Sequence, residues 1–183
     1  MAKQFDALDD AHQSFIAAQH LFFTGTAAAD GRVNVSPKGM DSLRVLGPNR
    51  IIWLNYTGSG NETAAHLAEV NRMTLMWCSF EKRPLILRVY GSARTLHPRD
   101  AGWDDLIAEF NPEIGARQIF DLQIDLVQTS CGYSIPFMEY VGERDTLTRH
   151  FEAKGEDTLP DYWAEKNTVS IDGLPTGITG DKS

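Results

Sequence analysis

Short runs of apolar and β-branched residues, separated by turn residues, recur along most of the chain and predict strands. The alternation of apolar and polar side chains is cleanest in FDLQIDLVQTS, residues 120–130. Asp30-Gly31 and Gly47-Pro48-Asn49 stand between neighbouring runs as hairpin turn signals. We expect six or seven strands, mostly in antiparallel hairpins, within residues 20–27, 32–38, 42–47, 50–56, 73–80, 85–97 and 120–130.

A longer period in the apolar positions indicates three or four helices, which fall at residues 11–19, 61–70, 99–110 and 144–155. Asp9 and Asp10 supply an acidic helix start, Pro98 fits a first helical turn, and Gly155 is typical of a helix end. Gly91 interrupts the longest predicted strand and indicates a bulge or bend. Hairpins with inserted helices favour a mainly β (α+β) fold, a small barrel decorated by helices, over a doubly wound sheet.

The length of 183 residues suits one domain. We expect that domain to span residues 1–155, because the remainder, residues 156–183, carries Gly, Pro, Asp and Thr with little periodicity. This C-terminal extension is expected to be either a surface strap or disordered. The sequence contains no internal repeat and no low-complexity block.

The formal net charge of −8 and the lack of a Lys/Arg run argue against nucleic acid and anionic membranes as partners. The N-terminal stretch lacks the apolar core of a signal peptide, and no apolar run approaches the ~20 residues that span a bilayer. Two isolated cysteines form no disulfide framework, and no histidine pair has metal-ligand spacing. We therefore expect a cytoplasmic protein without a metal site.

The stretch NYTGSGNETAAHL, residues 55–67, joins a predicted strand to a predicted helix and has three interpretations. Ser59 and Glu62 fit a capping box, in which each side chain bonds the backbone N–H of the other. Strand, Gly58-Ser59-Gly60 and helix also resemble a dinucleotide-binding loop, but Thr63 stands at the third glycine position and no second βαβ unit follows. The third interpretation is a phosphate site at the helix N-terminus, where free N–H groups attract anions.

A cation for such a phosphate is offered by RVNVSPK, residues 32–38. In a strand, Arg32, Asn34, Ser36 and Lys38 share one face, which gives two cations in line. A solvated hairpin strand is the alternative explanation of the same pattern.

Residues 22–97 resemble the pyridoxamine 5′-phosphate oxidase-like family of FMN-binding split barrels, because the order of the motifs is similar. A basic strand ending in Lys38 precedes a strand ending in Tyr56-Thr57, and a helix then opens at Asn61-Glu62-Thr63. The resemblance implies a six-stranded antiparallel Greek-key split β-barrel with peripheral helices. It also implies a homodimer that binds FMN at the subunit interface. The cofactor-binding residues that it implies are Arg32, Ser36, Pro37, Lys38, Tyr56, Thr57, Ser59, Asn61 and Thr63.

The sequence departs from the oxidases proper at the helix start. An Arg-Lys pair of those enzymes corresponds here to Glu62 and Thr63, and their C-terminal substrate motif with Arg and His is absent. The resemblance therefore implies a distinct subfamily: an FMN-dependent oxidoreductase that acts on an undefined small-molecule substrate or electron donor. A non-enzymatic flavin-binding or sensor module, or a barrel without flavin, would fit the same residues. No catalytic residue is assigned.

The segment SCGYSIP, residues 130–136, follows the last predicted strand. Tyr133 in it would face the flavin ring or a partner subunit, or else the segment is a turn that leaves the barrel. The second interpretation is favoured, because Pro136 ends a strand.

Overall fold

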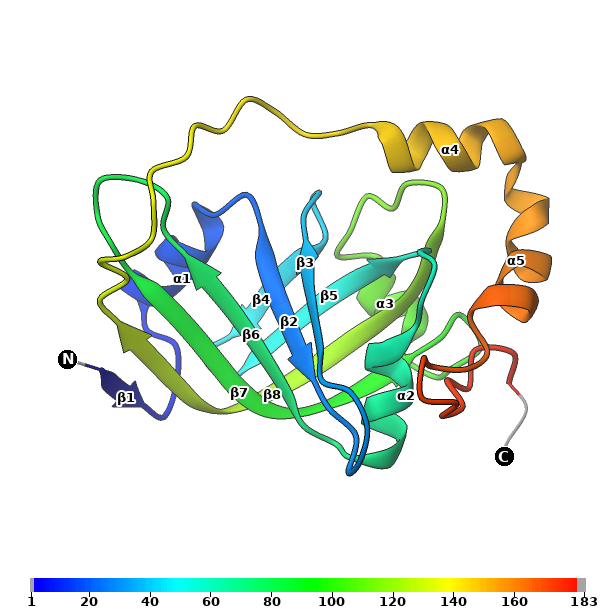
Figure 1. Cartoon of the computed structure of the whole chain (residues 1–183), viewed down its shortest axis with the longest axis horizontal. Coiled ribbons are helices and arrows are strands. Elements are labelled where there is room, and N and C mark those ends of the chain that lie inside the picture. Colours follow the sequence, from blue (N-terminus) through cyan, green and yellow to red (C-terminus); the bar gives the residue numbers. More distant parts are fainter. Residues whose placement is uncertain (1, 181–183) are drawn as a thin grey trace.

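The protein, seen in a computed structural model that describes residues 2–180, is built around one antiparallel sheet of eight strands (Figure 1). The strands are β1 (Lys3–Phe5), β2 (Phe22–Thr26), β3 (Asn34–Lys38), β4 (Leu43–Gly47), β5 (Arg50–Tyr56), β6 (Met73–Cys78), β7 (Ile86–Leu96) and β8 (Ala116–Ser130). They are arranged in the order β3-β2-β6-β7-β8-β5-β4, and β1 pairs with the far end of β8. The sheet curls so that β3 and β4 are its two edges, as in a split barrel.

The predicted antiparallel split barrel with peripheral helices is confirmed, but the number of strands is eight, not six. The seven predicted segments all contain strands, and β1 is the addition. Three residues cannot display a period, so β1 is defined only by its pairing with β8. Both predicted turns join paired strands, β2 to β3 and β4 to β5.

The bend predicted at Gly91 lies where the register of β7 against β8 shifts, between Tyr90 and Gly91. A Cβ atom on Gly91 would lie 1.9 Å from the carbonyl oxygen of Gln123 on β8. Only glycine allows this close approach of two backbones, which lets the two longest strands coil around the core.

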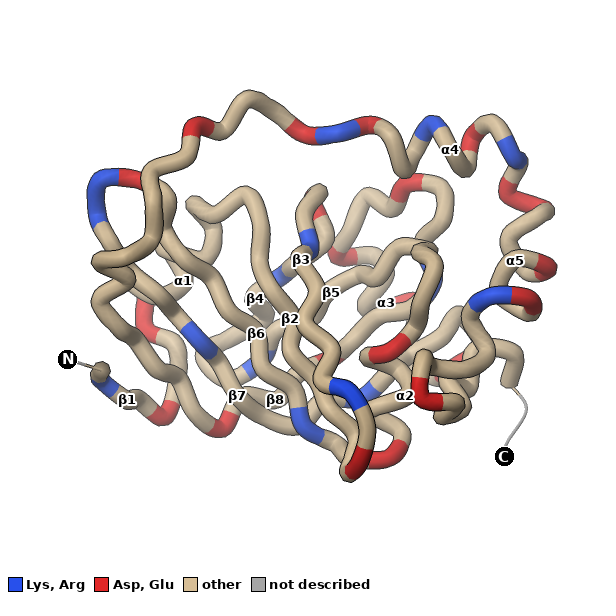
Figure 2. Tube along the Cα trace, in the orientation of Figure 1, with Lys and Arg blue, Asp and Glu red and all other residues tan. Residues whose placement is uncertain are grey.

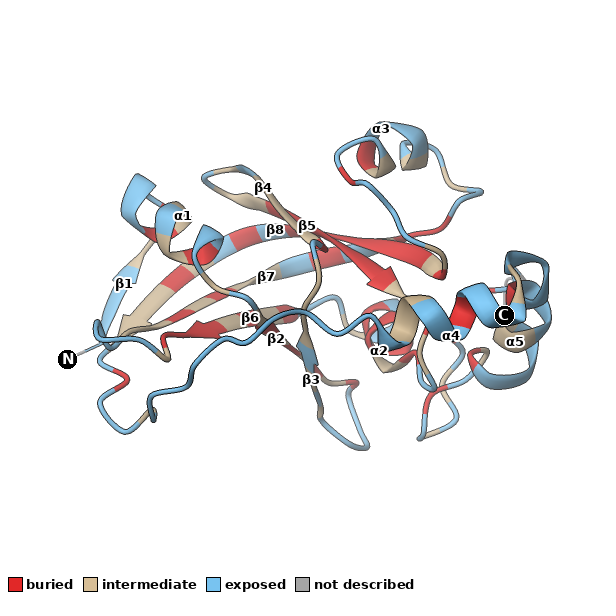
Figure 3. Cartoon of the chain, turned by 90° about the horizontal axis from the view of Figure 1, so that it is seen from above, coloured by how far each residue is buried: buried red, intermediate tan, exposed pale blue. Residues whose placement is uncertain are grey.

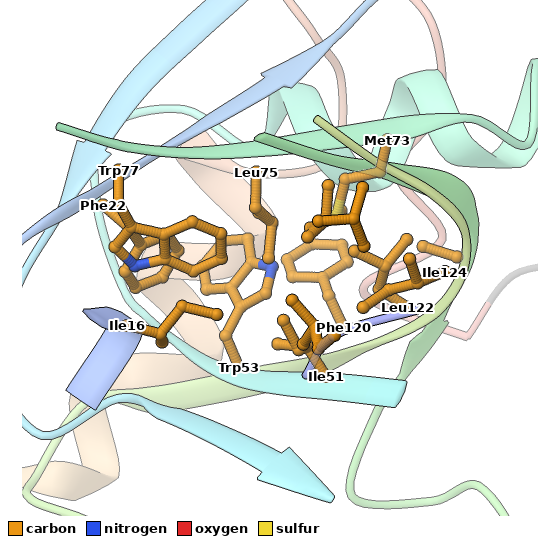
Figure 4. Packing of buried hydrophobic residues seen from close by; sticks show 14 of the residues in the cluster. Ile16, Phe22, Ile51, Trp53, Met73, Leu75, Trp77, Phe120, Leu122 and Ile124 are labelled. Carbon is orange, nitrogen blue, oxygen red and sulfur yellow. The ribbon is translucent and has the colours of Figure 1, made fainter. Parts of the chain in front are cut away.

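The main apolar core fills the inside of the curled sheet (Figure 4). Trp53 of β5 stacks on Phe120 of β8, with 4.6 Å between ring centroids, and Phe22 meets Trp53 edge to face. A smaller cluster under α3 (Trp103–Ile107) covers the outer face of β5 and β8. Burial of this apolar surface provides the main favourable free energy of folding.

The other helices are α1 (Asp10–Ala17), α2 (Glu62–Glu69), α4 (Thr146–Lys154), the short 3₁₀ helix η1 (Glu156–Thr158) and α5 (Leu159–Lys166). Asp9 caps α1 by accepting a hydrogen bond from the backbone N–H of His12, and Gly155 ends α4, as the sequence predicts. The predicted helix at residues 99–110 is shorter, because Gly102 has a left-handed φ of 86° and Asp100 accepts a bond from the His97 amide. These two features leave only Trp103–Ile107 as helix.

The C-terminal extension packs against the barrel. After α5, residues 167–178 form what we call the strap, which lies beside α2 (Figure 1). Neither expectation included the helices η1 and α5, which occupy residues 156–166 ahead of the strap. The domain boundary at residue 155 stays a prediction.

Residues 131–145 form an extended arm between β8 and α4, and most of the arm is exposed (Figure 3). Basic and acidic positions are interspersed along the trace, without a continuous basic stripe over the described residues (Figure 2). No helix within residues 2–180 has the length and apolar character needed to cross a membrane.

Candidate functional site

A cavity of about 630 Å³ opens between β3, the end of β5, the start of α2 and the strap. Eight of the nine residues predicted to bind the cofactor line it: Arg32, Ser36, Pro37, Lys38, Tyr56, Ser59, Asn61 and Thr63. Val33, Asn34, Val35, Asn55, Gly58, Gly60, Glu62, Arg117 and Ile171 complete the wall. The volume lies within the range typical of small-molecule sites.

Arg117, the second residue of β8, is the charged group that sequence analysis missed. Its side chain is buried, with 3% of the residue exposed. Its Nη1 donates to the carbonyl of Gly60 at 3.1 Å and to Oδ1 of Asn167 at 2.8 Å, while its Nε has no hydrogen-bond partner. Burial lowers its pKa to about 10. No carboxylate among residues 2–180 forms an ion pair with it.

Lys38, at the end of β3, brings a second cation to the same cavity. Its Nζ lies 5.4 Å from the ring centroid of Trp53. Burial and the positive charge of Arg117 lower its pKa to about 8. Loss of hydration disfavours the charged amine, and the nearby guanidinium adds to this effect. Apart from Arg32, the part of the cavity wall that residues 2–180 form carries two cations, Lys38 and Arg117, and one carboxylate, that of Glu62.

Arg32, the other predicted cation, is engaged elsewhere. Its side chain is 69% exposed and forms an ion pair with Asp172 of the strap, and its backbone N–H also donates to that carboxylate at 2.7 Å. The pair neutralises Arg32, so Arg32 adds little positive charge to the cavity in this arrangement.

The predicted capping box at the start of α2 is wrong. The helix begins at Glu62, two residues later than a cap at Ser59 requires, and no side chain caps its N-terminus. Both carboxylate oxygens of Glu62 instead accept the backbone N–H of Ile171 at 3.1 Å. The sequence pattern suited a local pair, but the strap offers Glu62 a partner that is distant in sequence.

Asn61 and Thr63, the residues before and after Glu62 in the chain, both line the cavity. Asn61 is buried in a reciprocal amide pair with Gln118, whose Nε2 donates to Asn61 Oδ1 at 2.6 Å. Thr63 Oγ1 accepts from Asn34 Nδ2 at 3.2 Å and keeps its own hydroxyl proton for another acceptor. Asn61 is therefore a fixed part of the wall, whereas Thr63 retains a donor.

The polar face predicted for β3 is present. Burial alternates along the strand, and Ser36 donates to Asn34 Oδ1 at 2.9 Å. The chain of bonds from Ser36 through Asn34 to Thr63 fixes the rotamers of three residues that line one side of the cavity.

Thr57 is the predicted residue that does not line the cavity. It is 1% exposed, donates to the carbonyl of Gly115 at 2.8 Å and accepts from the indole N–H of Trp163 at 2.8 Å. It thus joins the β5 end to α5. Its neighbour Tyr56 accepts the backbone N–H of Glu113 at its hydroxyl, and burial raises the Tyr56 pKa.

A second cavity, of about 660 Å³, adjoins the first and shares Pro37 and Lys38 with it. It lies between the end of β3 and the arm, where the rings of His20 and Tyr140 stack with 3.5 Å between centroids. Met40 in its wall has a left-handed φ of 61°, which is rare for a residue with a side chain. Such strained backbone tends to occur at functional sites.

The SCGYSIP segment forms a turn that leaves the barrel. Ile135 donates its backbone N–H to the carbonyl of Gly132, and Tyr133 is exposed and lines neither cavity in this chain. Within residues 2–180, no group of three or more His, Cys, Asp or Glu side chains is placed to hold a metal ion.

Comparison with known proteins gives three findings. The family model described as pyridoxamine 5′-phosphate oxidase matches residues 8–131. A protein of Aspergillus flavus, the pyridoxamine 5′-phosphate oxidase family protein ustO, is 32% identical over 191 aligned positions, which cover 93% of this chain and 76% of that protein.

Solved structures support the same fold. A candidate pyridoxamine 5′-phosphate oxidase from Lactobacillus delbrueckii aligns over 67% of this chain and 94% of its own, with a TM-score of 0.55 and 22% identity. HupZ of Group A Streptococcus aligns over 65% of this chain and 91% of its own, with a TM-score of 0.52 and 16% identity. With two thirds of the sequence matched by one family model and a 32% identical relative, this chain belongs to the pyridoxamine 5′-phosphate oxidase family.

Proposed function

We propose that this protein binds FMN in the first cavity and acts as a flavin-dependent oxidoreductase of a subfamily distinct from the true pyridoxamine phosphate oxidases. The observation that carries the proposal is Arg117, a buried guanidinium with an unpaired Nε and no carboxylate partner among residues 2–180. A buried charge without a counter-ion is costly for a folded protein. A phosphate in the cavity would provide both the charge and the acceptor.

The residues present fit an FMN phosphate. Lys38 is the second cation, and Thr63 and Ser36 carry hydroxyl groups on the cavity wall. Gly58 has open space where a side chain would stand, so the turn between β5 and α2 leaves room for a ligand close to the backbone. Arg117 would thus add to Lys38 one positive charge where the Arg-Lys pair is replaced by Glu62 and Thr63.

Bound FMN would supply the capacity to accept or donate a hydride or electrons. The chain's own residues would anchor the phosphate, orient the ring and limit access of water. The rigid chain from Ser36 through Asn34 to Thr63 suits the orienting task, because its bonds fix side-chain rotamers before a ligand arrives.

The small-molecule substrate or electron donor would occupy the second cavity, which meets the first at Pro37 and Lys38. We further propose a homodimer in which the partner closes the cofactor site. The edge strand β3 presents exposed Val33 and Val35, and the arm exposes Phe137, Met138 and Val141. Exposed apolar residues in such number are typical of an interaction surface when they form a contiguous patch.

The test is FMN titration of the purified protein, followed by quenching of flavin fluorescence. Arg117→Gln should raise the FMN dissociation constant by 30-fold or more, about 2 kcal/mol or above, as expected for removing a buried charge from an ion pair. Arg94→Gln is the matched control, because Arg94 is an exposed arginine on β7 that pairs with Asp121 away from the cavity. A wild-type protein that takes up no added FMN, or an Arg117→Gln variant with unchanged affinity, would contradict the proposal.

A second measurement separates an enzyme from a non-enzymatic flavin-binding module. The module is the alternative function because Glu62 and Thr63 stand where the oxidases proper have an Arg-Lys pair. Bleaching of the bound flavin by NADH or NADPH under anaerobic conditions supports an oxidoreductase. Flavin absorption that stays unchanged with NADH, with NADPH and with a mixture of small-molecule metabolites supports the binding module.

A further inference from the structure

We propose that the strap, residues 167–178, is an integral part of the phosphate subsite, with Asn167 as the residue that positions Arg117. This inference rests on the proposed function, since it assigns regulation and specificity of the same site. It adds a contribution from the C-terminal extension, which lies outside the sequence segment matched by the family model.

Asn167 is fully buried and joins the two sides of the subsite. Its Oδ1 accepts from Arg117 Nη1 at 2.8 Å, and its Nδ2 donates to the carbonyl of Gly58 at 3.0 Å. One side-chain amide therefore fixes both the guanidinium and the glycine turn. The backbone oxygen of Asn167 accepts in turn from the hydroxyl of Thr176 at 2.6 Å, which folds the strap back on itself.

The chemistry of the amide is as informative as its place. A neutral acceptor can hold a guanidinium in position without cancelling its charge, whereas a carboxylate at the same distance would form a salt bridge. Arg117 is thereby oriented and keeps its charge, and its buried Nε has no hydrogen-bond partner among residues 2–180. This combination is what a preorganised phosphate-binding group requires.

The acidic group of the strap that approaches the cavity region is directed to another partner. The Asp172 carboxylate binds both the guanidinium and the backbone N–H of Arg32, near the tip of the β2–β3 hairpin. A Cβ atom on Gly31 would lie 2.5 Å from Asp172 Oδ2, so glycine is needed for this contact. At the neighbouring residue, Ile171, the backbone N–H donates to Glu62 of α2. Arg99 also donates to the carbonyl oxygens of Gly177 and Ile178, so the strap is attached at four places. The strap group that touches Arg117 is neutral.

Because the strap contributes to the subsite, anion binding and strap closure must favour each other to the same extent. Phosphate or FMN should protect residues 167–178 from proteolysis. Loosening the strap should weaken the binding of either probe, even when the barrel is unchanged.

The decisive variants are Asn167→Asp and Asn167→Ala, studied in the full chain. Asp has nearly the shape of Asn and keeps the acceptor for Arg117, but it loses the donor to Gly58 and adds a negative charge beside the guanidinium. We expect Asn167→Asp to raise the FMN dissociation constant at least tenfold and more than Asn167→Ala does. A purely structural role predicts instead that the affinity lost by each variant follows the unfolding free energy that it loses, because both variants remove the donor to the Gly58 carbonyl. Val169→Asp is the matched control, since it adds the same charge at a half-exposed strap position, and it should change the constant less than twofold.

A second probe separates failure of this inference from failure of the proposed function. Inorganic phosphate should raise the thermal unfolding temperature of the wild type and not that of Asn167→Asp. If phosphate stabilises only the wild type while FMN does not bind, the proposed function fails and the inference stands. If FMN binds the wild type and a folded Asn167→Asp variant equally, the inference fails alone.

Should Asn167→Asp not fold, Thr176→Val provides the same information. It removes the hydrogen bond to the Asn167 backbone while keeping the side-chain shape. It should weaken FMN binding severalfold and increase cleavage within the strap. Unchanged affinity together with increased cleavage would overturn the proposal.

Discussion

Strand β8 passes through two buried regions that differ in chemistry. From Ile119 to Ile124 most of its side chains join apolar clusters, where Trp53 stacks on Phe120. At its start, Arg117 and Gln118 are also buried but contact polar partners from the turn before α2 and from the strap. We call this second region, made of Asn61, Arg117, Gln118 and Asn167, the polar junction.

The two regions obtain their stability in different ways. The apolar core depends on surface removed from water and on close packing, so its side chains are interchangeable within limits of volume. The polar junction depends on each donor meeting an acceptor, because an unmatched buried group costs about 1–3 kcal/mol. Arg117 Nε has no partner among residues 2–180, which is the observation behind the anion binding proposed above.

The largest expected effect is in the apolar core. Trp53→Ala removes a side chain that packs against Phe22 and Phe120, and it should lower the free energy of unfolding by about 3–5 kcal/mol. Urea denaturation followed by circular dichroism measures it. Trp53→Phe, which keeps an aromatic ring, should lose clearly less. Equal losses would mean that the ring stack contributes nothing beyond shape.

In the polar junction, the losses of unfolding free energy caused by substitutions at Asn61 and Gln118 should depend on each other. Asn61→Leu or Gln118→Met leaves the other amide without its partner and should cost about 1–3 kcal/mol. The double variant should cost about 1 kcal/mol less than the sum, because no unmatched amide remains. A double-mutant cycle on unfolding free energies gives this number. Additive losses would show that the two amides do not stabilise each other and would remove the contrast with the core.

The smallest expected effect concerns Lys38 in the cofactor-free protein. Its folded pKa of about 8 lies below the ordinary value of 10.5, so below pH 8 the fold bears the cost of a half-buried charge. Lys38→Met should therefore increase the unfolding free energy at pH 7 by about 1 kcal/mol. Between pH 8 and 10.5 the unfolded wild type binds more protons than the folded form. Wild-type stability then rises with pH relative to the variant, and the advantage of the variant disappears.

The same variant tests binding against stability. Wild-type affinity for FMN should fall as the pH rises through about 8, because Lys38 of the FMN-free protein loses its charge there. The Lys38→Met variant should bind more weakly at pH 7 and should not show this step. A variant that is both less stable and unchanged in binding would refute the role given to Lys38.

Local patterns in the sequence were sufficient for much of the fold. Alternation and turn residues predicted seven of the eight strands, and the positions of Gly91 and Gly155 were interpreted correctly. The polar face of β3 was also predictable from the sequence, because side chains at positions i and i+2 of a strand lie on the same face. The predicted capping box failed because a distant backbone N–H, that of Ile171, proved the better partner for Glu62.

By itself, then, the sequence determined the strands, the turns, the family and a cavity wall around Lys38, because these depend on local periodicity and on ordered motifs. Only the tertiary structure decided which cations share the cavity. Arg117 and Asn167 are 50 residues apart and lie outside the motifs, and their contact requires the C-terminal extension to return to the barrel. For the same reason the sequence did not show that Arg32 pairs with Asp172 instead of adding its charge to the cavity. The two residues are 140 positions apart, and a pair that depends on packing leaves no periodic signal in the chain.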